Sequence, residues 1–282
     1  MFPEERPVAF VRSDVVDEDL RRRLDESGYA HSTFPSDYDR FRPRPPAAIL
    51  ELLPLLVGAD RLRLVVDLGC GTGLSARIWT ERADEIVAIE PNEAMRTFAE
   101  RVTTAANPKY LGTSAYATGL SDASADLVTA AQSLQWMAPE RVFPEVARIL
   151  RPGGIFCAYN YVALQTPLWE PEAVFESVLA RKAELRRQLG LDREPPGPQL
   201  SRDLLEASGV FRRTKELVLH SVERGDGERL LGFALSEGSM RTLLDAGTTE
   251  SEVGLDRLRA VASTVREPIP WWIGYRAWIG LR

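Results

Sequence analysis

The sequence is poor in the residues that build covalent or metal-bound frameworks. It contains two cysteines and two histidines among 282 residues. The two cysteines, Cys70 and Cys157, provide no disulfide framework. His31 and His220 lie far apart in the sequence and indicate no metal-ligand cluster. We therefore expect a fold that is stabilised by its hydrophobic core, without a metal site.

Long apolar runs and an excess of positive charge are also absent. No stretch reaches the roughly eighteen apolar residues that span a bilayer, and the opening segment MFPEERPVAF has no basic part followed by an apolar one. These features predict a cytoplasmic protein with no membrane partner. The net charge of -6 argues against a nucleic-acid partner, because binding a duplex requires a basic face. The oligomeric state cannot be read from the sequence.

Short apolar runs alternate with helical patterns through the middle of the chain. A helix is expected after Pro46, with Ile49, Leu52, Leu53 and Leu56 on one face and Gly58 at its end. Strands are then expected at 63–68, 85–90, 109–112, 125–131 and 154–160, with helices at 73–83, 92–102 and 138–150 between them and a turn at 152–154. Such alternation predicts an α/β fold with a parallel sheet.

The two ends of the chain follow other patterns. Residues 14–27 read as a short helix, and 34–46, rich in proline, arginine and aromatic residues, read as a loop or lid. Beyond about residue 162 we expect a helical insertion with Phe175, Val178 and Leu179 inward, a strand at 215–223, and a final strand at 271–281. His220 is interpreted as a structural histidine in its strand, and Trp271, Trp272, Tyr275 and Trp278 as side chains that pack the sheet edge. The expected domains are 1–45 (helix and lid), 46–162 (core) and 163–282 (insertion and final strands).

The most informative segment is VVDLGCGTG, residues 65–73. A buried strand ends at Asp67 and runs into a loop with glycines at 69, 71 and 73. Glycine permits unusual backbone dihedrals and lacks the Cβ that would block a ligand, and the helix that follows presents its positive end. The alternative interpretation is a tight turn without a ligand.

Glu90 strengthens the ligand interpretation. It ends the next apolar strand, seventeen residues after Gly73. A carboxylate at the carboxyl end of the adjacent strand can accept hydrogen bonds from both hydroxyls of a ribose, so a nucleoside ligand is expected. Taken alone, Glu90 could instead be solvated or cap the helix that begins after Pro91 and Asn92.

With VVDLGCGTG, VAIEPNEAM, DLVTAAQSLQWM and LRPGG in this order, the chain resembles the class I S-adenosylmethionine-dependent methyltransferases. Within them, QSLQWM and the YDRFRP lid are similar to the methyltransferase type 11, trans-aconitate methyltransferase-like group. The resemblance covers roughly residues 62–160. It implies a Rossmann-like, doubly wound, mostly parallel seven-stranded sheet with an antiparallel last strand and a helical lid or insertion. It also implies S-adenosylmethionine as cofactor and S-adenosylhomocysteine as product.

The resemblance also implies the cofactor-binding residues. Asp67, Gly69 and Gly71 would lie against the methionine part, and Glu90 would hold the ribose. Tyr38 and Arg42 would close over the cofactor carboxylate, which an arginine fork suits. The complete set is Tyr38, Arg42, Asp67, Gly69, Cys70, Gly71, Glu90, Pro91, Asn92, Met95, Ser114, Ala115, Gln132 and Ser133. Ser114 and Ala115 occupy the adenine neighbourhood without the polar or acidic group usual in the family.

One departure from the family concerns the acceptor side. Trp136 matches the aromatic residue of the family's His-Trp pair, but Gln135 replaces the histidine, so a histidine base cannot be carried over. Trp136 could also be simple core packing. Other acceptor candidates, chosen by position only, are Tyr159, Tyr161, Trp169 and Met240.

These features predict methyl transfer to a small molecule by in-line displacement. The protein would contribute alignment and a dry site rather than a dedicated base. A carboxylate or acidic phenol already carries the charge needed for attack, so O-methylation is expected. Alternatives are N- or C-methylation of a small natural product, or a protein that binds the cofactor without catalysis. A nicotinamide oxidoreductase is disfavoured because Leu74 breaks the G-x-G-x-x-G spacing, and a macromolecular acceptor is disfavoured by the acidic charge.

Overall fold

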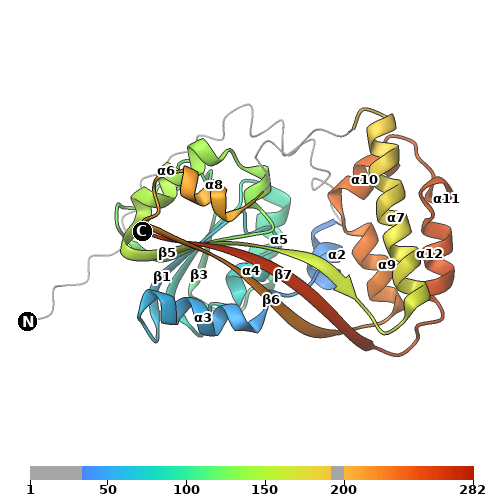
Figure 1. Cartoon of the computed structure of the whole chain (residues 1–282), viewed down its shortest axis with the longest axis horizontal. Helices are drawn as coiled ribbons and strands as arrows, with labels where there is room; N and C mark the ends of the chain where they lie inside the picture. The colour runs from blue at the N-terminus through green and yellow to red at the C-terminus, as the bar shows by residue number, and fades with distance from the viewer. Residues whose placement is uncertain (1–33, 192–199) are drawn as a thin grey trace, which may run out of the picture.

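The computed structural model describes residues 34–191 and 200–282, and a single sheet forms their centre. The sheet has seven strands in the order β3-β2-β1-β4-β5-β7-β6 (Figure 1). Strands β1 to β5 pair in parallel, whereas β7 is antiparallel to both of its neighbours. The predicted mostly parallel sheet with an antiparallel last strand is confirmed. The strands are β1 (Leu62–Leu68), β2 (Ala83–Ile89), β3 (Pro108–Leu111), β4 (Ala125–Ala131), β5 (Leu150–Gln165), β6 (Arg213–Gly225) and β7 (Ile269–Leu281).

Helices cover both faces of the sheet. On one face α3 (Ala47–Val57) packs Ile49 and Leu53 against the strands. On the other face α6 (Pro139–Ile149) and α8 (Arg202–Ala207) cover a second apolar cluster that contains Val142 and Leu205. Figure 1 shows α3 below the sheet and α6 and α8 above it. Because both faces are covered, central strands such as β4 are almost wholly buried and mostly apolar, as parallel strands usually are.

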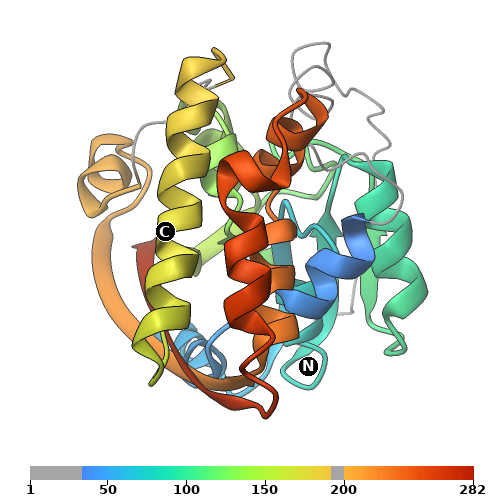
Figure 2. The same cartoon turned by 90° about the vertical axis from the view of Figure 1, so that its right-hand side faces the viewer.

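A group of helices lies at one end of the sheet. From here on this group is called the lid, and it does not include the segment 34–46 that is predicted from the sequence as a loop or lid. It consists of α7 (Trp169–Gln188), α9 (Gly227–Leu235), α10 (Gly238–Asp245), α11 (Glu250–Val253) and α12 (Leu255–Ala262). Figures 1 and 2 show these helices stacked side by side and joined to the sheet through the long strands β5, β6 and β7. Phe175 and Val178 point inward, as predicted, and pack with Phe233.

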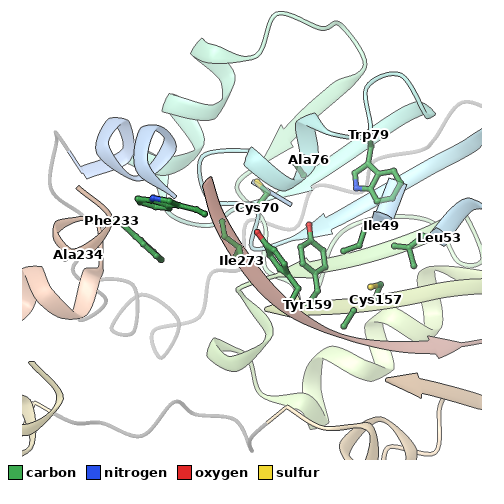
Figure 3. Close-up of a cluster of buried hydrophobic side chains, with 14 of the residues drawn as sticks. Ile49, Leu53, Cys70, Ala76, Trp79, Cys157, Tyr159, Phe233, Ala234 and Ile273 are labelled. Atoms are coloured by element: carbon green, nitrogen blue, oxygen red, sulfur yellow. The ribbon is translucent and has the colours of Figure 1, made fainter. Parts of the chain in front are cut away.

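One apolar cluster runs from the sheet into the lid. Figure 3 shows Ile49 and Trp79 on one side of Tyr159, and Ile273 and Phe233 on the other. All belong to the same buried cluster. Burying apolar area contributes about 25 cal/mol per Å², so this continuity couples the position of the lid to the core.

The interpretation of residues 34–46 as a loop is wrong for its first half. Residues Phe34–Phe41 form helix α2, which contacts α9 of the lid and α5 (Glu93–Val102) of the core. Phe34 and Phe41, seven residues apart, are both buried on one helix face. Pro35 occupies the first turn, where proline is tolerated, so the prolines do not prevent the helix. The helix predicted at 14–27 lies outside the described residues.

Some elements differ locally from the prediction, and others agree with it. The helix predicted at 73–83 is reduced to α4 (Leu74–Arg77), followed by turns up to Arg82. Strand β5 begins directly after α6, and the predicted turn at 152–154 is an irregularity in its pairing with β4, with Gly153 at φ +82°. The helices at 47–57 and 92–102 agree with the prediction, and Gly58 ends the first in a left-handed conformation.

The last two strands correct the interpretation of His220. Along β6 the even-numbered side chains from Glu216 to Arg224 are exposed, and His220 is one of them. It is therefore a solvent-facing residue, not a buried structural histidine. In β7, Trp271, Tyr275 and Trp278 are buried in the sheet as expected, whereas Trp272 is 41% exposed.

Candidate active site

The glycine loop lies where the carboxyl ends of β1 and β2 meet. Gly69 and Cys70 donate their backbone N–H groups to the carbonyl of Ile89, at 2.8 and 3.0 Å. Gly69, Gly71 and Gly73 all have positive φ, at 67°, 57° and 82°. Residues with side chains rarely adopt this conformation. Glycine is therefore favoured at these three positions by the backbone conformation of the loop.

Space around the loop gives a second reason for two of the glycines. A Cβ on Gly69 would lie 2.7 Å from the Cβ of Ser133, and one on Gly73 would lie 2.5 Å from the hydroxyl of Tyr110. Neither separation is sterically possible. A Cβ on Gly71 would only touch Met95, at 3.4 Å. The loop is therefore packed against β3 and the segment after β4.

Glu90 faces the loop from the end of β2. One of its carboxylate oxygens accepts the N–H of Gly71 and the other accepts the N–H of Asn92, both at 2.8 Å. Burial raises the pKa of Glu90 to about 7, although these two N–H groups favour its charged form. A buried carboxylate fixed by two backbone donors is a pre-oriented acceptor for ligand hydroxyls.

Asp67 lies at the end of β1, beneath the loop. It accepts a hydrogen bond from the Ser75 hydroxyl and another from Thr129 at 2.7 Å. Burial raises the pKa of Asp67 to about 6, opposed by these two hydroxyl donors. Ser75 and Thr129 were not among the predicted site residues. Their position one helical turn after the loop and on the neighbouring strand is the signal that could have identified them.

The residues expected near the adenosine surround the start of α5 and the end of β3. Asn92, which follows Pro91, caps α5 by accepting the N–H of Met95 at 3.1 Å, and Met95 packs against Gly71. Ser114 and Ala115 lie in the loop after β3, and the Ser114 hydroxyl accepts the N–H of Tyr116. All but half-buried Pro91 are buried.

The carboxyl end of β4 contains a strained residue. Gln132 has φ +54°, a conformation that costs energy for a residue with a side chain and that is concentrated at functional sites. Its N–H donates to the carbonyl of Tyr159 at 3.0 Å. The hydroxyl of the next residue, Ser133, donates to the carbonyl of Leu68 at 2.6 Å. Gln132 and Ser133 thus lie between the glycine loop and β5.

Arg42 connects the segment after α2 to the lid and to β5. Its guanidinium donates to the Tyr161 hydroxyl and, at 2.7 Å, to the carbonyl of Ser236. It also stacks over the rings of Tyr38 and Phe233, at 4.9 and 5.1 Å from their centroids. Burial raises the pKa of Tyr38, Arg42 opposes this, and the charge of Glu90 adds to the increase. Tyr38 therefore lies within electrostatic reach of both Arg42 and Glu90.

The acceptor candidates occupy very different positions. Tyr159 is buried, and among residues 34–191 and 200–282 its hydroxyl has no hydrogen-bond partner. Tyr161 binds Arg42, and Met240 is fully buried in the lid core. Trp136 is 45% exposed in a short turn after β4. Trp169 is 91% exposed at the start of α7, and its role as an acceptor residue stays a prediction.

The geometry fits a nucleoside cofactor with a methionine-like tail. The loop leaves no room for side chains at Gly69 and Gly73, and a fixed carboxylate, Glu90, faces it. The amide nitrogen of Gln132 is also buried and has no partner among the described residues. Glu90, Asp67 and the glycine loop would hold the cofactor. Within residues 34–191 and 200–282 there is no cluster of three His, Cys, Asp or Glu residues that could hold a metal ion.

The part of the chain that the structure describes contains no helix that could span a membrane. None of its helices combines the length and the apolarity that crossing a bilayer requires.

Comparisons with known proteins show which proteins the chain resembles. Residues 66–158 match the family model described as a methyltransferase domain. An uncharacterized methyltransferase of Mycobacterium tuberculosis is 44% identical over 121 residues, which are 42% of this chain and 46% of that protein. A trans-aconitate 2-methyltransferase of Delftia acidovorans is 32% identical over 139 residues, 47% of this chain and 48% of that protein. The chain spans about half the length of these curated relatives.

Solved structures share the fold over most of the chain. A protein described as a type II methyltransferase from Anaeromyxobacter dehalogenans aligns with a TM-score of 0.62 at 24% identity, covering 86% of this chain and 98% of that one. Phosphoethanolamine N-methyltransferase 2 of Haemonchus contortus, solved with S-adenosylmethionine, aligns with a TM-score of 0.53 at 19% identity, covering 94% of this chain and 60% of that one. Residues 66–158 are therefore similar to a methyltransferase domain, and the chain shares the fold of these solved methyltransferases.

Proposed function

We propose that this protein binds S-adenosylmethionine and transfers its methyl group to an oxygen of a small organic acid, either a carboxylate or an acidic phenol. The observation that carries the cofactor assignment is Glu90, a buried carboxylate held against the glycine loop by the N–H groups of Gly71 and Asn92. Two hydroxyl groups of a ribose would bind such a carboxylate as donors.

The acceptor assignment depends on side chains just after the carboxyl end of β4 and on the part of β5 beside it. Gln132, Gln135 and Asn160 are all amides, which neither donate a proton to nor remove one from an acceptor at neutral pH. An alcohol or an amine cation would require a base, whereas a carboxylate is already nucleophilic. The relative from Delftia acidovorans, whose name specifies an acid as substrate, supports the same class.

When bound, S-adenosylmethionine would supply an electrophilic methyl group: the acid oxygen forms the new O–CH3 bond as the C–S bond breaks, and no proton is released. The protein's contribution is alignment and exclusion of water. Glu90 and Asp67 would hold the cofactor, and the aromatic side chains of Tyr38, Tyr161 and Phe233 would keep the neighbouring volume dry.

The first test is isothermal titration of the purified protein with S-adenosylmethionine, S-adenosylhomocysteine and NADH. We expect micromolar affinity for both adenosyl ligands and none for NADH. Glu90→Ala should lose this binding, whereas Glu93→Ala, an exposed carboxylate in the first turn of α5, is the matched control and should keep it. A folded protein that binds neither adenosyl ligand would contradict the proposal.

The second test identifies the methylated atom. The protein, S-adenosylmethionine and a panel of carboxylic acids and phenols are incubated, and mass spectrometry detects methyl esters and methyl ethers. Products methylated only on nitrogen or carbon would refute O-methylation while leaving the cofactor assignment intact.

A further inference from the structure

Three amide side chains form a hydrogen-bonded unit beside the carboxyl end of β4, called the amide cluster here: Gln132, Gln135 and, from within β5, Asn160. The Nε2 of Gln135 donates to the backbone carbonyl of Gln132 at 2.9 Å. Its Oε1 accepts from the Nδ2 of Asn160 at 3.3 Å. Gln135 therefore uses both ends of its amide within the protein and connects the segment after β4 to β5.

The backbone carbonyl fixes the orientation of this unit. A carbonyl only accepts, so the Gln135 amide must present its nitrogen to Gln132 and its oxygen to Asn160. That oxygen in turn requires a donor, so Asn160 must present Nδ2. The Oδ1 of Asn160 is consequently the atom that remains, and it is a hydrogen-bond acceptor.

Two complementary atoms of the cluster are buried without a partner among residues 34–191 and 200–282. They are the Oδ1 of Asn160, an acceptor, and the Nε2 of Gln132, a donor. Buried polar atoms are nearly always satisfied, because an unpaired one has lost its hydrogen bonds to water without replacement. Such atoms next to a strained residue are a reason to expect a ligand.

The cluster lies next to the candidate cofactor site. Gln132 precedes Ser133, whose Cβ is in the space that a Cβ on Gly69 would need. The N–H of Gln132 also donates to the carbonyl of Tyr159, the residue before Asn160. A ligand held by Gln132 and Asn160 would therefore be adjacent to the end of the glycine loop that the methionine part of a cofactor would occupy.

We infer that Gln132 and Asn160 recognise the methyl acceptor, and that the acceptor is a hydroxy acid. The Nε2 of Gln132 donates to the carboxylate, and the Oδ1 of Asn160 accepts from a hydroxyl on a neighbouring carbon. Gln135 is a positioning residue that aligns the two. This inference rests on the proposed function, because it concerns the acceptor of that reaction.

A hydroxyl-binding site discriminates strongly against a ligand that lacks the hydroxyl. The acid without it would leave Asn160 Oδ1 unpaired in a closed site, which lowers affinity by roughly tenfold or more. A site lined only by apolar groups would show the opposite preference, because it would have to desolvate the hydroxyl.

The test measures binding, so that it does not depend on turnover. Protein saturated with S-adenosylhomocysteine is titrated with 2-hydroxyhexanoate and with hexanoate, which differ only in the hydroxyl. Tighter binding of the hydroxy acid by roughly tenfold or more is expected. Equal binding, preference for hexanoate, or no binding of either acid to the loaded protein would each overturn the inference.

Two variants separate the roles of the two ligand atoms. Asn160→Leu removes the acceptor and should abolish the preference, bringing the ratio of the two dissociation constants close to one. Gln132→Glu replaces the donor by an anion and should weaken both acids by roughly tenfold or more while retaining their ratio. Gln188→Glu, the same change at an exposed position on α7, is the control and should alter neither value.

Binding of S-adenosylhomocysteine distinguishes this inference from the proposed function. If the wild-type protein fails to bind it, the proposed function fails. If it binds, and the titrations with the two acids do not differ between wild type, Asn160→Leu and Gln132→Glu, only the assignment of the amide cluster fails. Circular dichroism spectra of the variants check that each one is folded.

Discussion

The buried carboxylate of Glu90 has a consequence for stability as a function of pH. Its pKa rises from an ordinary value of 4.5 to about 7 in the folded protein, chiefly because of burial. The folded state then binds a proton more tightly than the unfolded state between these values. Stability contributed in this way is fully present below pH 4.5 and is lost as the pH rises through 7.

The size of this effect follows from the two pKa values. Relative to low pH, this pKa difference lowers the unfolding free energy by about 1.5 kcal/mol at pH 5.5, where mainly the unfolded state is ionised, and by about 3 kcal/mol at pH 8. Glu90→Gln removes this titration. It also loses one of the two hydrogen bonds from Gly71 and Asn92, at a cost of about 1–3 kcal/mol, but that cost is the same at both pH values.

The difference between two pH values therefore isolates the carboxylate. We subtract the unfolding free energy of wild type from that of Glu90→Gln. This difference should be about 2 kcal/mol more positive at pH 8 than at pH 5.5, so the variant gains stability relative to wild type as the pH rises. Urea unfolding followed by tryptophan fluorescence, without ligand, measures it. A relative stability that is the same at both pH values, or that changes in the opposite direction, would refute the assigned burial of the charge. Asp67 also titrates in this range and is present in both proteins, and its charge raises the pKa of Glu90 less than burial does.

Two further substitutions test the packing of the site and of the lid. Gly69→Ala places a Cβ 2.7 Å from the Cβ of Ser133; it should lower the unfolding free energy by about 2–4 kcal/mol and weaken binding of S-adenosylmethionine. Gly153→Ala, at a similar positive φ but in open space, should lower the unfolding free energy by only about 1 kcal/mol and leave binding unchanged. Equal effects of the two substitutions would contradict the close packing of the loop. Lys182→Met leaves the largely buried carboxylate of Glu237 without its ion-pair partner and should lower the unfolding free energy by about 2 kcal/mol. A double variant that adds Glu237→Gln should recover most of this loss. A double variant no more stable than Lys182→Met would show that the ion pair does not contribute to stability.

Elements with strong local signals could be predicted from the sequence. The strand at 125–131 and the helix at 92–102 agree with the structure almost to the residue, because one is a mostly apolar run and the other has a capping asparagine and an apolar stripe. The glycine loop and Glu90 were predictable for the same reason, since glycine spacing and an acidic strand end are both local features.

Elements whose form depends on packing could not be predicted. Helix α2 was hidden by prolines, although Phe34 and Phe41 lie on one face of it, and its contacts are with α9 and α5, distant in sequence. His220 was taken as buried because it alternates with Val218 and Val222, yet all three are on the solvent face of β6. Alternation alone identifies two faces of a strand but not which one is covered.

Arg42 shows why the role of a site residue is harder to predict than its location. The resemblance placed its guanidinium on the cofactor carboxylate. In the structure the same group binds Tyr161 and the carbonyl of Ser236, which are 119 and 194 residues away in the sequence, and stacks on Phe233. These contacts join the segment after α2 to β5 and to the end of α9. A cofactor carboxylate bound by other N–H groups of the same guanidinium would share this residue with the lid contacts, so cofactor binding and the packing of the lid would be energetically coupled at Arg42.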